Sequence, residues 1–408
     1  MQNKKFYPWL VVAMLWVVAL LNYLDRQMLA TMQPFMKISI EELNSAANFG
    51  RLMAVFLWIY AFMSTISGII ADRLNRKWLI VGSLLVWSMV TLTMGYAKTF
   101  DQLYFLRAIM GISEAFYIPA GLALIVDYHQ DKTRSIAVGI HTTGIYLGQA
   151  FGGFGATIAA VTSWQMTFHT FGLIGIAYSL VLVFFLKEKK GYTVDNTRKI
   201  TMRQEFSNAF KGLGMLFGNI CFWVILFYFA APSLPGWATK SWLPTLFSDT
   251  LHMDMSQAGP LSTITISMAS LVGVLFGGYL SDKWVQKNLK GRVYTGAIGL
   301  GLTIPALFLL GYSTSFIPVL GGALCFGIFD VNNMPILCQF VSPRYRATGY
   351  GIMNLAGISA GAFITDFLGK SIDAGNLGRD FAMLTIVVAL AIVLQLIVLR
   401  PKTVNMTE

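Results

Sequence analysis

Twelve long apolar stretches dominate this 408-residue chain and restrict what it can fold into. A helix needs about 20 apolar residues to cross a bilayer, and only helices or closed barrels satisfy every backbone polar group in hydrocarbon. The stretches therefore predict an all-α polytopic membrane protein. They lie near 9–31, 51–71, 78–97, 104–127, 135–160, 167–186, 214–247, 259–281, 293–312, 316–338, 348–368 and 379–399.

The composition agrees with a membrane protein. Hydrophobic residues make up 56% of the chain and charged residues only 12%, whereas soluble domains carry about 25% charged residues. The net charge of +11 does not indicate nucleic-acid binding, because the basic residues lie in short loops between spans. No cleavable signal peptide is predicted, since the first apolar run continues as a span.

The spans divide into six plus six around a charged connector. We predict an N-terminal six-helix bundle over 1–186, a cytoplasmic connector over 187–213 and a C-terminal six-helix bundle over 214–408. The seventh run contains Pro232, Pro235 and Pro244, and so predicts a broken helix.

Basic residues set the predicted orientation. With both termini inside, 22 lysines and arginines fall on the cytoplasmic side and 5 on the outside. This asymmetry predicts an N-in, C-in topology.

The two halves also share a short pattern. Gly68 and Asp72 follow the second span in GIIADRLNRK, and Gly278 and Asp282 follow the eighth span in GGYLSDKW, with the same spacing. Such a repeat predicts two similar bundles, with a substrate site between them near mid-membrane.

Four charges lie inside spans of the first half. Asp25 and Arg26 occur in NYLDRQ, while Arg107 and Glu114 share one helix face with Gly111 at i, i+4 and i+7. Charges in hydrocarbon are costly and usually functional. We expect the two acids and two bases to meet inside the bundle, either as a transport site or as a static salt-bridge cluster.

Such a cluster suits proton coupling. Burial raises the pKa of a carboxylic acid and a nearby arginine lowers it, so an acid that loses its arginine to a substrate carboxylate takes up a proton more easily. Arginine fits this task because its planar fork binds a carboxylate through two hydrogen bonds and stays charged.

The stretch from Gly68 to Lys77 resembles the signature loop of the major facilitator superfamily, with Asn75 in place of the usual second glycine. NYLDRQ, FLRAIMGISEAFYIPA (105–120) and SWLPTLF (241–247) are similar to the anion:cation symporter family of galactonate, hexuronate and sialin-type carriers. The first two motifs also resemble Spinster lipid transporters. HTTGIYLGQAFGG (141–153) is closer to the organic-anion carriers.

The resemblance to the symporters implies roles for five residues. Asp25 and Glu114 match the proton sites, Arg26 and Arg107 match the residues that organise these acids and the anion, and Tyr60 matches a tyrosine that contacts the substrate carboxylate. An ordinary core tyrosine is the alternative for the last position.

Other polar residues at mid-membrane depth are candidates for substrate contacts. For Lys240, the alternative is a lysine that snorkels to the outer surface. For Asp330, Asn332 and Asn333, the alternative is hydrogen bonding to the backbone groups freed before Pro335. The candidates are Gln149, Lys240, Asp330, Asn332, Asn333 and Asn354.

A glycine and several charged residues at cytoplasmic helix ends are candidates for an inner gate, as the resemblance implies. The alternative is that the bases only set topology. They are Gly68, Asp72, Arg73, Arg76, Lys77, Asp127, Arg134 and Asp282. PRYRATG (343–349) is a further gate candidate, and His141 and His169 are expected to be structural.

The sequence therefore favours a secondary transporter. An enzyme is disfavoured because no nucleotide loop, metal-ligand cluster or nucleophile motif is present, and a channel because it would not explain the halved repeat with one buried charge cluster in the first half. We expect proton-coupled symport of a small organic anion such as a uronate, aldonate or sialic acid. The expected carrier is a monomer in a bacterial inner membrane, with no cofactor beyond the coupling proton. A Spinster-like lysolipid carrier and a neutral-sugar proton symporter are the alternatives.

Overall fold

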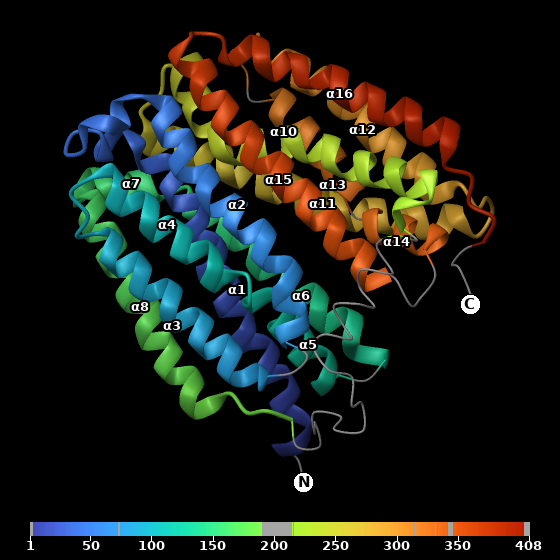
Figure 1. The fold of residues 1–408 in the computed structure, drawn as a ribbon, viewed down its shortest axis with the longest axis horizontal. Helices are drawn as coiled ribbons and strands as arrows, with labels where there is room; N and C mark the ends of the chain where they lie inside the picture. Colours follow the sequence, from blue (N-terminus) through green and yellow to red (C-terminus); the bar gives the residue numbers. More distant parts are fainter. Residues whose placement is uncertain are drawn as a thin grey trace. The chain divides into compact units, whose positions relative to one another are not determined.

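The computed structural model describes residues 3–71, 74–129, 131–189, 214, 216–312, 315, 317–330, 332–341 and 346–403. All regular elements of these residues are helices (Figure 1). The described helices form twelve spans that are long and apolar enough to cross a membrane. The predicted number and order of spans are therefore confirmed.

The first six spans are built from α1 (Asn3–Met36), α2 (Ala46–Ala71), α3 (Arg76–Met94), α4 (Phe100–Glu114) with α5 (Tyr117–Tyr128), α6 (Asp131–Gly152) with α7 (Gly155–Val161), and α8 (Trp164–Phe185). A short 3-10 helix, η1 (Glu41–Asn44), precedes α2.

The last six spans are α10 (Ile220–Thr250), α11 (Met255–Val285), α12 (Gly291–Leu310), α13 (Ile317–Asp330) with α14 (Asn333–Phe340), α15 (Arg346–Asp373) and α16 (Leu377–Val398).

The expected break in the seventh span is wrong. Residues 220–250 form one continuous helix, α10, despite its three prolines. Transmembrane helices tolerate proline where neighbouring side chains satisfy the freed backbone carbonyls. In α10, Pro244 removes the helical donor of the Lys240 carbonyl. The side-chain amide of Gln27 in α1 replaces it, with Nε2 donating to this carbonyl at 2.8 Å.

The fourth and the tenth spans are each interrupted, and the two interruptions resemble each other. α4 ends at Glu114 and α5 begins three residues later, while α13 ends at Asp330 and α14 begins three residues later. Pro119 and Pro335 each follow their acid by five residues and occupy the third position of the second helix. Proline clashes with the carbonyl four residues before it, which places both breaks just after the acid.

A glycine three residues before each acid allows close packing of a neighbouring helix. A Cβ added at Gly111 would lie 2.8 Å from the Phe56 carbonyl oxygen of α2, and one at Gly327 would meet the Ser270 carbonyl oxygen of α11. The two halves thus share the pattern Gly-Ile-x-acid-x4-Pro, which extends the predicted repeat.

The chain forms two compact units. Unit 1 contains residues 1–196, 240–264 and 365–373, and within it α1 packs along α6, α3 along α8 and α2 against α4. Unit 2 contains residues 197–239, 265–364 and 374–408, and its core includes Phe222, Tyr228 and Phe329. The predicted bundle boundaries at the connector stay a prediction.

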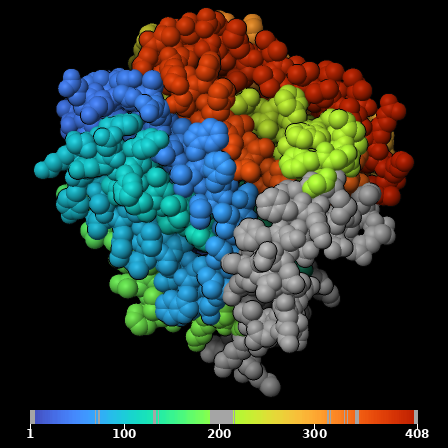
Figure 2. Space-filling view, viewed as in Figure 1, coloured from blue at the N-terminus to red at the C-terminus, as the bar shows by residue number. Residues whose placement is uncertain are grey.

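The outer face of α16 shows the environment that the fold requires. This helix, red in Figure 2, exposes Ile386, Leu390, Val393 and Ile397 along one side. Soluble proteins rarely expose large continuous apolar patches. A lipid-facing helix satisfies this pattern, and the protein is an integral, multi-pass membrane protein.

Candidate functional site

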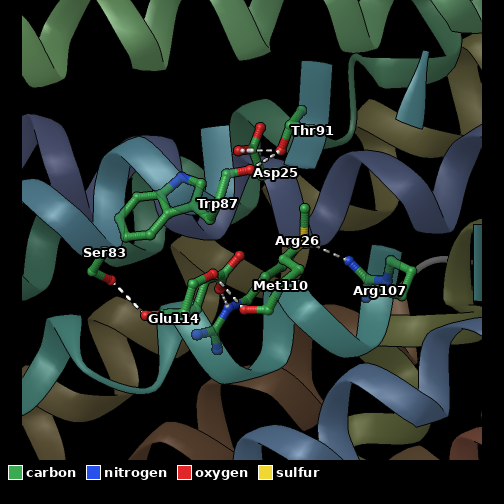
Figure 3. A network of polar contacts seen from close by, with 9 residues as sticks. Asp25, Arg26, Ser83, Trp87, Thr91, Arg107, Met110 and Glu114 are labelled. Carbon is green, nitrogen blue, oxygen red and sulfur yellow. Dashed lines mark hydrogen bonds and ion pairs between the residues drawn. The ribbon is translucent and has the colours of Figure 1, made fainter. Parts of the chain in front are cut away.

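A buried ion pair joins the first and fourth spans in unit 1. Arg26 Nε of α1 donates to Glu114 Oε2 of α4 at 2.6 Å (Figure 3), and the two side chains are 10% and 0% exposed. Charges this deeply buried must be paired to be tolerated. The expected meeting of the charged residues is therefore present in the structure.

The helix break holds Glu114 in place. Because α4 ends at this residue, the carbonyl of Ser113 at the helix end receives a long backbone hydrogen bond, from Phe116 N at 3.4 Å, in the described chain. Ser83 Oγ of α3 donates a shorter hydrogen bond to this carbonyl, at 2.6 Å. The break, the hydroxyl of α3 and the close α2–α4 approach at Gly111 together fix the acid against Arg26.

Aromatic rings surround the Arg26 guanidinium. Its Cζ lies 4.8 Å from the ring centre of Tyr23, 4.9 Å from that of Phe56 and 4.4 Å from that of Tyr60. Such cation–π contacts stabilise a desolvated cation. They place Tyr60 beside Arg26, while its predicted contact with the substrate carboxylate stays a prediction.

Arg107 is the less satisfied of the two arginines. It is 3% exposed, its Nη1 donates to the thioether of Met110 at 3.2 Å, and its Cζ lies 4.5 Å from the Phe56 ring centre. In the described part of the chain it makes no ion pair, and its buried Nε has no hydrogen-bond partner. A thioether is a weak acceptor, so the guanidinium keeps hydrogen-bonding capacity for an anion.

Asp25 completes the group from α1. It is 5% exposed, and one carboxylate oxygen accepts a hydrogen bond from Thr91 Oγ1 of α3 at 3.3 Å (Figure 3). Glu114 and Arg107 act on it electrostatically. We call Asp25, Arg26, Arg107 and Glu114 the four-charge cluster.

Comparisons with known proteins identify the family. Residues 15–365 match the sequence model of the Major Facilitator Superfamily. The chain belongs to this superfamily. It is therefore a transporter and not an enzyme.

Relatives in this superfamily carry small organic anions. A probable L-galactonate transporter of Escherichia coli strain K12 is 25% identical over 376 residues, covering 88% of this chain and 82% of the relative. The 4-hydroxybenzoate transporter PcaK of Pseudomonas putida is 28% identical over 386 residues, covering 85% and 82%.

The fold is shared with solved superfamily structures. A bacterial homolog of the human lysosomal transporter Spinster superposes with a TM-score of 0.76 at 20% identity, covering 96% of this chain and 97% of the other. At this identity the likeness concerns the fold.

Three predicted substrate residues lie on helices other than α1 and α4. Gln149 is buried on α6, and Asn354 is half-buried on α15 in unit 2. Lys240 of α10 accepts a hydrogen bond at its backbone carbonyl from Gln27 Nε2, at 2.8 Å. This contact brings the lysine's backbone next to the α1 segment that carries the charges.

The second-half candidates lie at the break between α13 and α14. Asn332 is buried, donates to the Ile328 carbonyl at 2.9 Å and accepts from Ser281 of α11. Asn333 donates to Asp330 Oδ1 at 3.0 Å, while its own buried carbonyl oxygen has no partner. Asp330 is exposed. The structure thus uses Asn332 for backbone and side-chain bonds, which is the alternative weighed for this group.

The signature loop is tied within unit 1. Arg76 forms an ion pair with Asp127 of α5 and donates to the Ala123 carbonyl at 3.2 Å. Lys77 Nζ donates to the Val183 carbonyl of α8 at 2.8 Å. Asp72 and Arg73 lie outside the described residues, as do residues 343–345 of PRYRATG.

The remaining gate candidates are at the surface or loosely held. Arg134 is exposed on α6, and Asp282 accepts from Arg292 at 3.4 Å with 72% of its side chain exposed. A Cβ at Gly68 would meet nothing within 4 Å. Their gating role stays a prediction.

The sequence did not single out several residues that complete the site. Tyr23 and Phe56 flank Arg26, Met110 holds Arg107, and Ser83 and Thr91 bond to the α4 end and to Asp25. Phe56 lies four residues before the predicted Tyr60, so helix periodicity could have placed it on the same helix face. The hydroxyl residues Ser83 and Thr91 lie on an apolar helix, where no sequence pattern marks them.

Proposed function

We propose that this protein is a proton-coupled symporter of small organic anions, with sugar acids as the substrate class. The observation that carries the proposal is the buried four-charge cluster, in which Arg107 is held by a thioether while Arg26 holds Glu114. The cluster offers an anion one unsatisfied guanidinium and offers a proton two carboxylates.

Charge balance links the anion and the proton. With both arginines and both acids ionised, the cluster is neutral. A bound carboxylate would leave one excess negative charge in a region of low dielectric, where uncompensated charge is costly. Protonation of one acid restores neutrality, so the anion and the proton bind together. Alternating access then carries both across.

The relatives support the substrate class. Relatives named as a probable L-galactonate transporter, a D-galactonate transporter and a 4-hydroxybenzoate transporter have carboxylates as their substrates. We propose a hydroxylated acid because Asp330 and Asn333 supply polar groups to unit 2. We also propose a bacterial inner membrane, a single-chain carrier and cytoplasmic termini, in line with the bacterial relatives and the loop charges.

Uptake into proteoliposomes tests the proposal. Labelled D-galactonate, D-glucuronate, N-acetylneuraminate, 4-hydroxybenzoate, galactose and a lysophospholipid would be supplied with and without an inward proton gradient. We expect gradient-driven accumulation of at least one sugar acid. Accumulation that ignores the gradient refutes symport, and transport restricted to galactose or to the lipid favours the alternative carriers.

Variants locate the site. Arg107→Ala should abolish anion binding, and Asp25→Asn and Glu114→Gln should abolish concentrative uptake. Arg51→Ala, at an exposed position of α2, is the control. Full gradient-driven uptake by both acid variants would contradict the proposed proton sites.

A further inference from the structure

The two acids of the four-charge cluster have different hydrogen-bond partners. Glu114 accepts from a guanidinium, which only donates, so this partner favours the ionised acid alone. Asp25 accepts from a hydroxyl group, which both donates and accepts. The difference bears on which acid can exchange a proton without leaving a partner unsatisfied.

Thr91 has a second acceptor within reach. Its Oγ1 lies 3.3 Å from Asp25 Oδ2 and 3.0 Å from the carbonyl oxygen of Trp87, one turn earlier in α3. The hydroxyl carries one hydrogen, which serves one acceptor at a time. Thr91 is 0% exposed, so water does not compete for it.

We propose that Thr91 is a positioning residue that keeps Asp25 hydrogen-bonded in both protonation states. When Asp25 is ionised, Thr91 donates to its carboxylate. When Asp25 is protonated, the acid donates its hydrogen to Thr91 Oγ1, and Thr91 donates to the Trp87 carbonyl. No heavy atom moves between the two arrangements. Asp25 is then the acid that exchanges the proton, while Glu114 stays ion-paired with Arg26.

No other titratable group described around α1 offers Asp25 this exchange. α4 presents Glu114 and Arg107, which act on Asp25 through charge, and Tyr60 of α2 faces Arg26. On other helices packed against α1, His141 of α6 is bonded to Tyr117 of α5, and Tyr178 of α8 donates to the Met14 carbonyl.

The inference rests on the proposed proton coupling, and infrared difference spectroscopy tests it without substrate. Protein reconstituted in lipid would be titrated, and the C=O band of a protonated acid would be followed. We expect a band that disappears in Asp25→Asn and persists in Glu114→Gln. In Thr91→Val this band should change in frequency and in titration midpoint, and Thr91→Ser should restore both.

A matched control comes from the same helix. Thr93 donates to the Met89 carbonyl at 2.7 Å, as Thr91 does to Trp87, but is exposed and makes no bond to an acid. Thr93→Val should leave the Asp25 band unchanged. An Asp25 band that is identical in Thr91→Val and wild type overturns the inference, as does a titrating band that Asp25→Asn does not remove.

Transport separates this inference from the proposed function. If the wild type shows gradient-driven uptake of D-galactonate, Thr91→Val should lower accumulation while anion exchange persists, and Thr91→Ser should recover accumulation. Equal accumulation in Thr91→Val and Thr93→Val refutes the role of Thr91 alone. Uptake by the wild type that ignores the proton gradient refutes the proposed function, whatever the infrared spectra show.

Discussion

The Arg26–Glu114 pair allows a direct test of whether burial determines how much an ion pair contributes to the free energy of unfolding of this protein. Glu114→Gln keeps the side-chain shape and an accepting oxygen but removes the negative charge. Arg26 is then left as a buried cation without its direct partner. Breaking a buried pair in this way costs about 3–5 kcal/mol, and we expect a loss of this size in the free energy of unfolding.

A second pair with the same N···O separation serves as the control. Lys370 Nζ lies 2.6 Å from Asp366 Oδ2, the same separation as in the buried pair, but the two side chains are 60% and 27% exposed. An exposed pair four residues apart on a helix contributes about 0.3–0.5 kcal/mol. Asp366→Asn should therefore be nearly neutral, which isolates burial as the cause of the difference.

The assay is unfolding in mixed detergent micelles with rising dodecyl sulfate, followed by circular dichroism. Removing both charges with Arg26→Met and Glu114→Gln should recover much of the stability lost in the single variant, because no unpaired charge remains buried. A Glu114→Gln cost equal to that of Asp366→Asn, or a double variant no more stable than the additive expectation, would refute the reasoning.

Three further predictions concern packing and helix ends. Gly111→Ala brings a Cβ to 2.8 Å from a carbonyl oxygen of α2; this is about 0.5 Å closer than carbon and oxygen normally approach, and the overpacking should cost about 1–3 kcal/mol in the same unfolding assay, whereas Gly139→Ala, which meets open space, should be silent. Asp373→Ala removes the acceptor of two N–H groups at the start of α2, at 2.8 and 3.0 Å, and should lower stability by about 1 kcal/mol; an unchanged melting temperature would contradict this capping role. Tyr60→Phe should keep the ring over Arg26 and its stability, while Tyr60→Ala removes a buried ring and should lose about 3–5 kcal/mol; equal losses in both variants would show that the hydroxyl, not the ring, matters.

The sequence predicted the spans well because hydrocarbon leaves few alternatives. Length and hydropathy determine a transmembrane helix almost alone, so all twelve spans were found. The same logic predicted that Asp25, Arg26, Arg107 and Glu114 lie together, since charges inside a bundle must find partners. It did not predict which charges pair directly, because that depends on side-chain rotamers and on helix rotation.

The predicted break in the seventh span is wrong, while the fourth and tenth spans are interrupted, because a proline does not by itself decide whether a helix ends. Three prolines leave α10 continuous, whereas one proline interrupts the fourth span after Glu114 and another interrupts the tenth after Asp330. Proline alone does not decide the outcome. At Glu114, a hydroxyl from α3 satisfies the helix end, and such a partner cannot be located from sequence. Thr91 was missed for the same reason.

The two halves share the same helix interruption but surround its acid with different side chains. Gly-Ile-x-acid-x4-Pro produces the same interruption in both, with the acid as the last helical residue and a glycine packed on a neighbouring helix. Yet Glu114 meets an arginine of α1, whereas Asp330 meets the amide of Asn333 from its own break. The repeat therefore supplies two acids at equivalent backbone positions, and the side chains around them decide what each can do. An ion-paired acid with a neighbouring arginine suits an anion and a proton. An exposed acid beside an unsatisfied amide oxygen suits hydroxyl donors, which is why we propose charge recognition by the first half and hydroxyl recognition by the second.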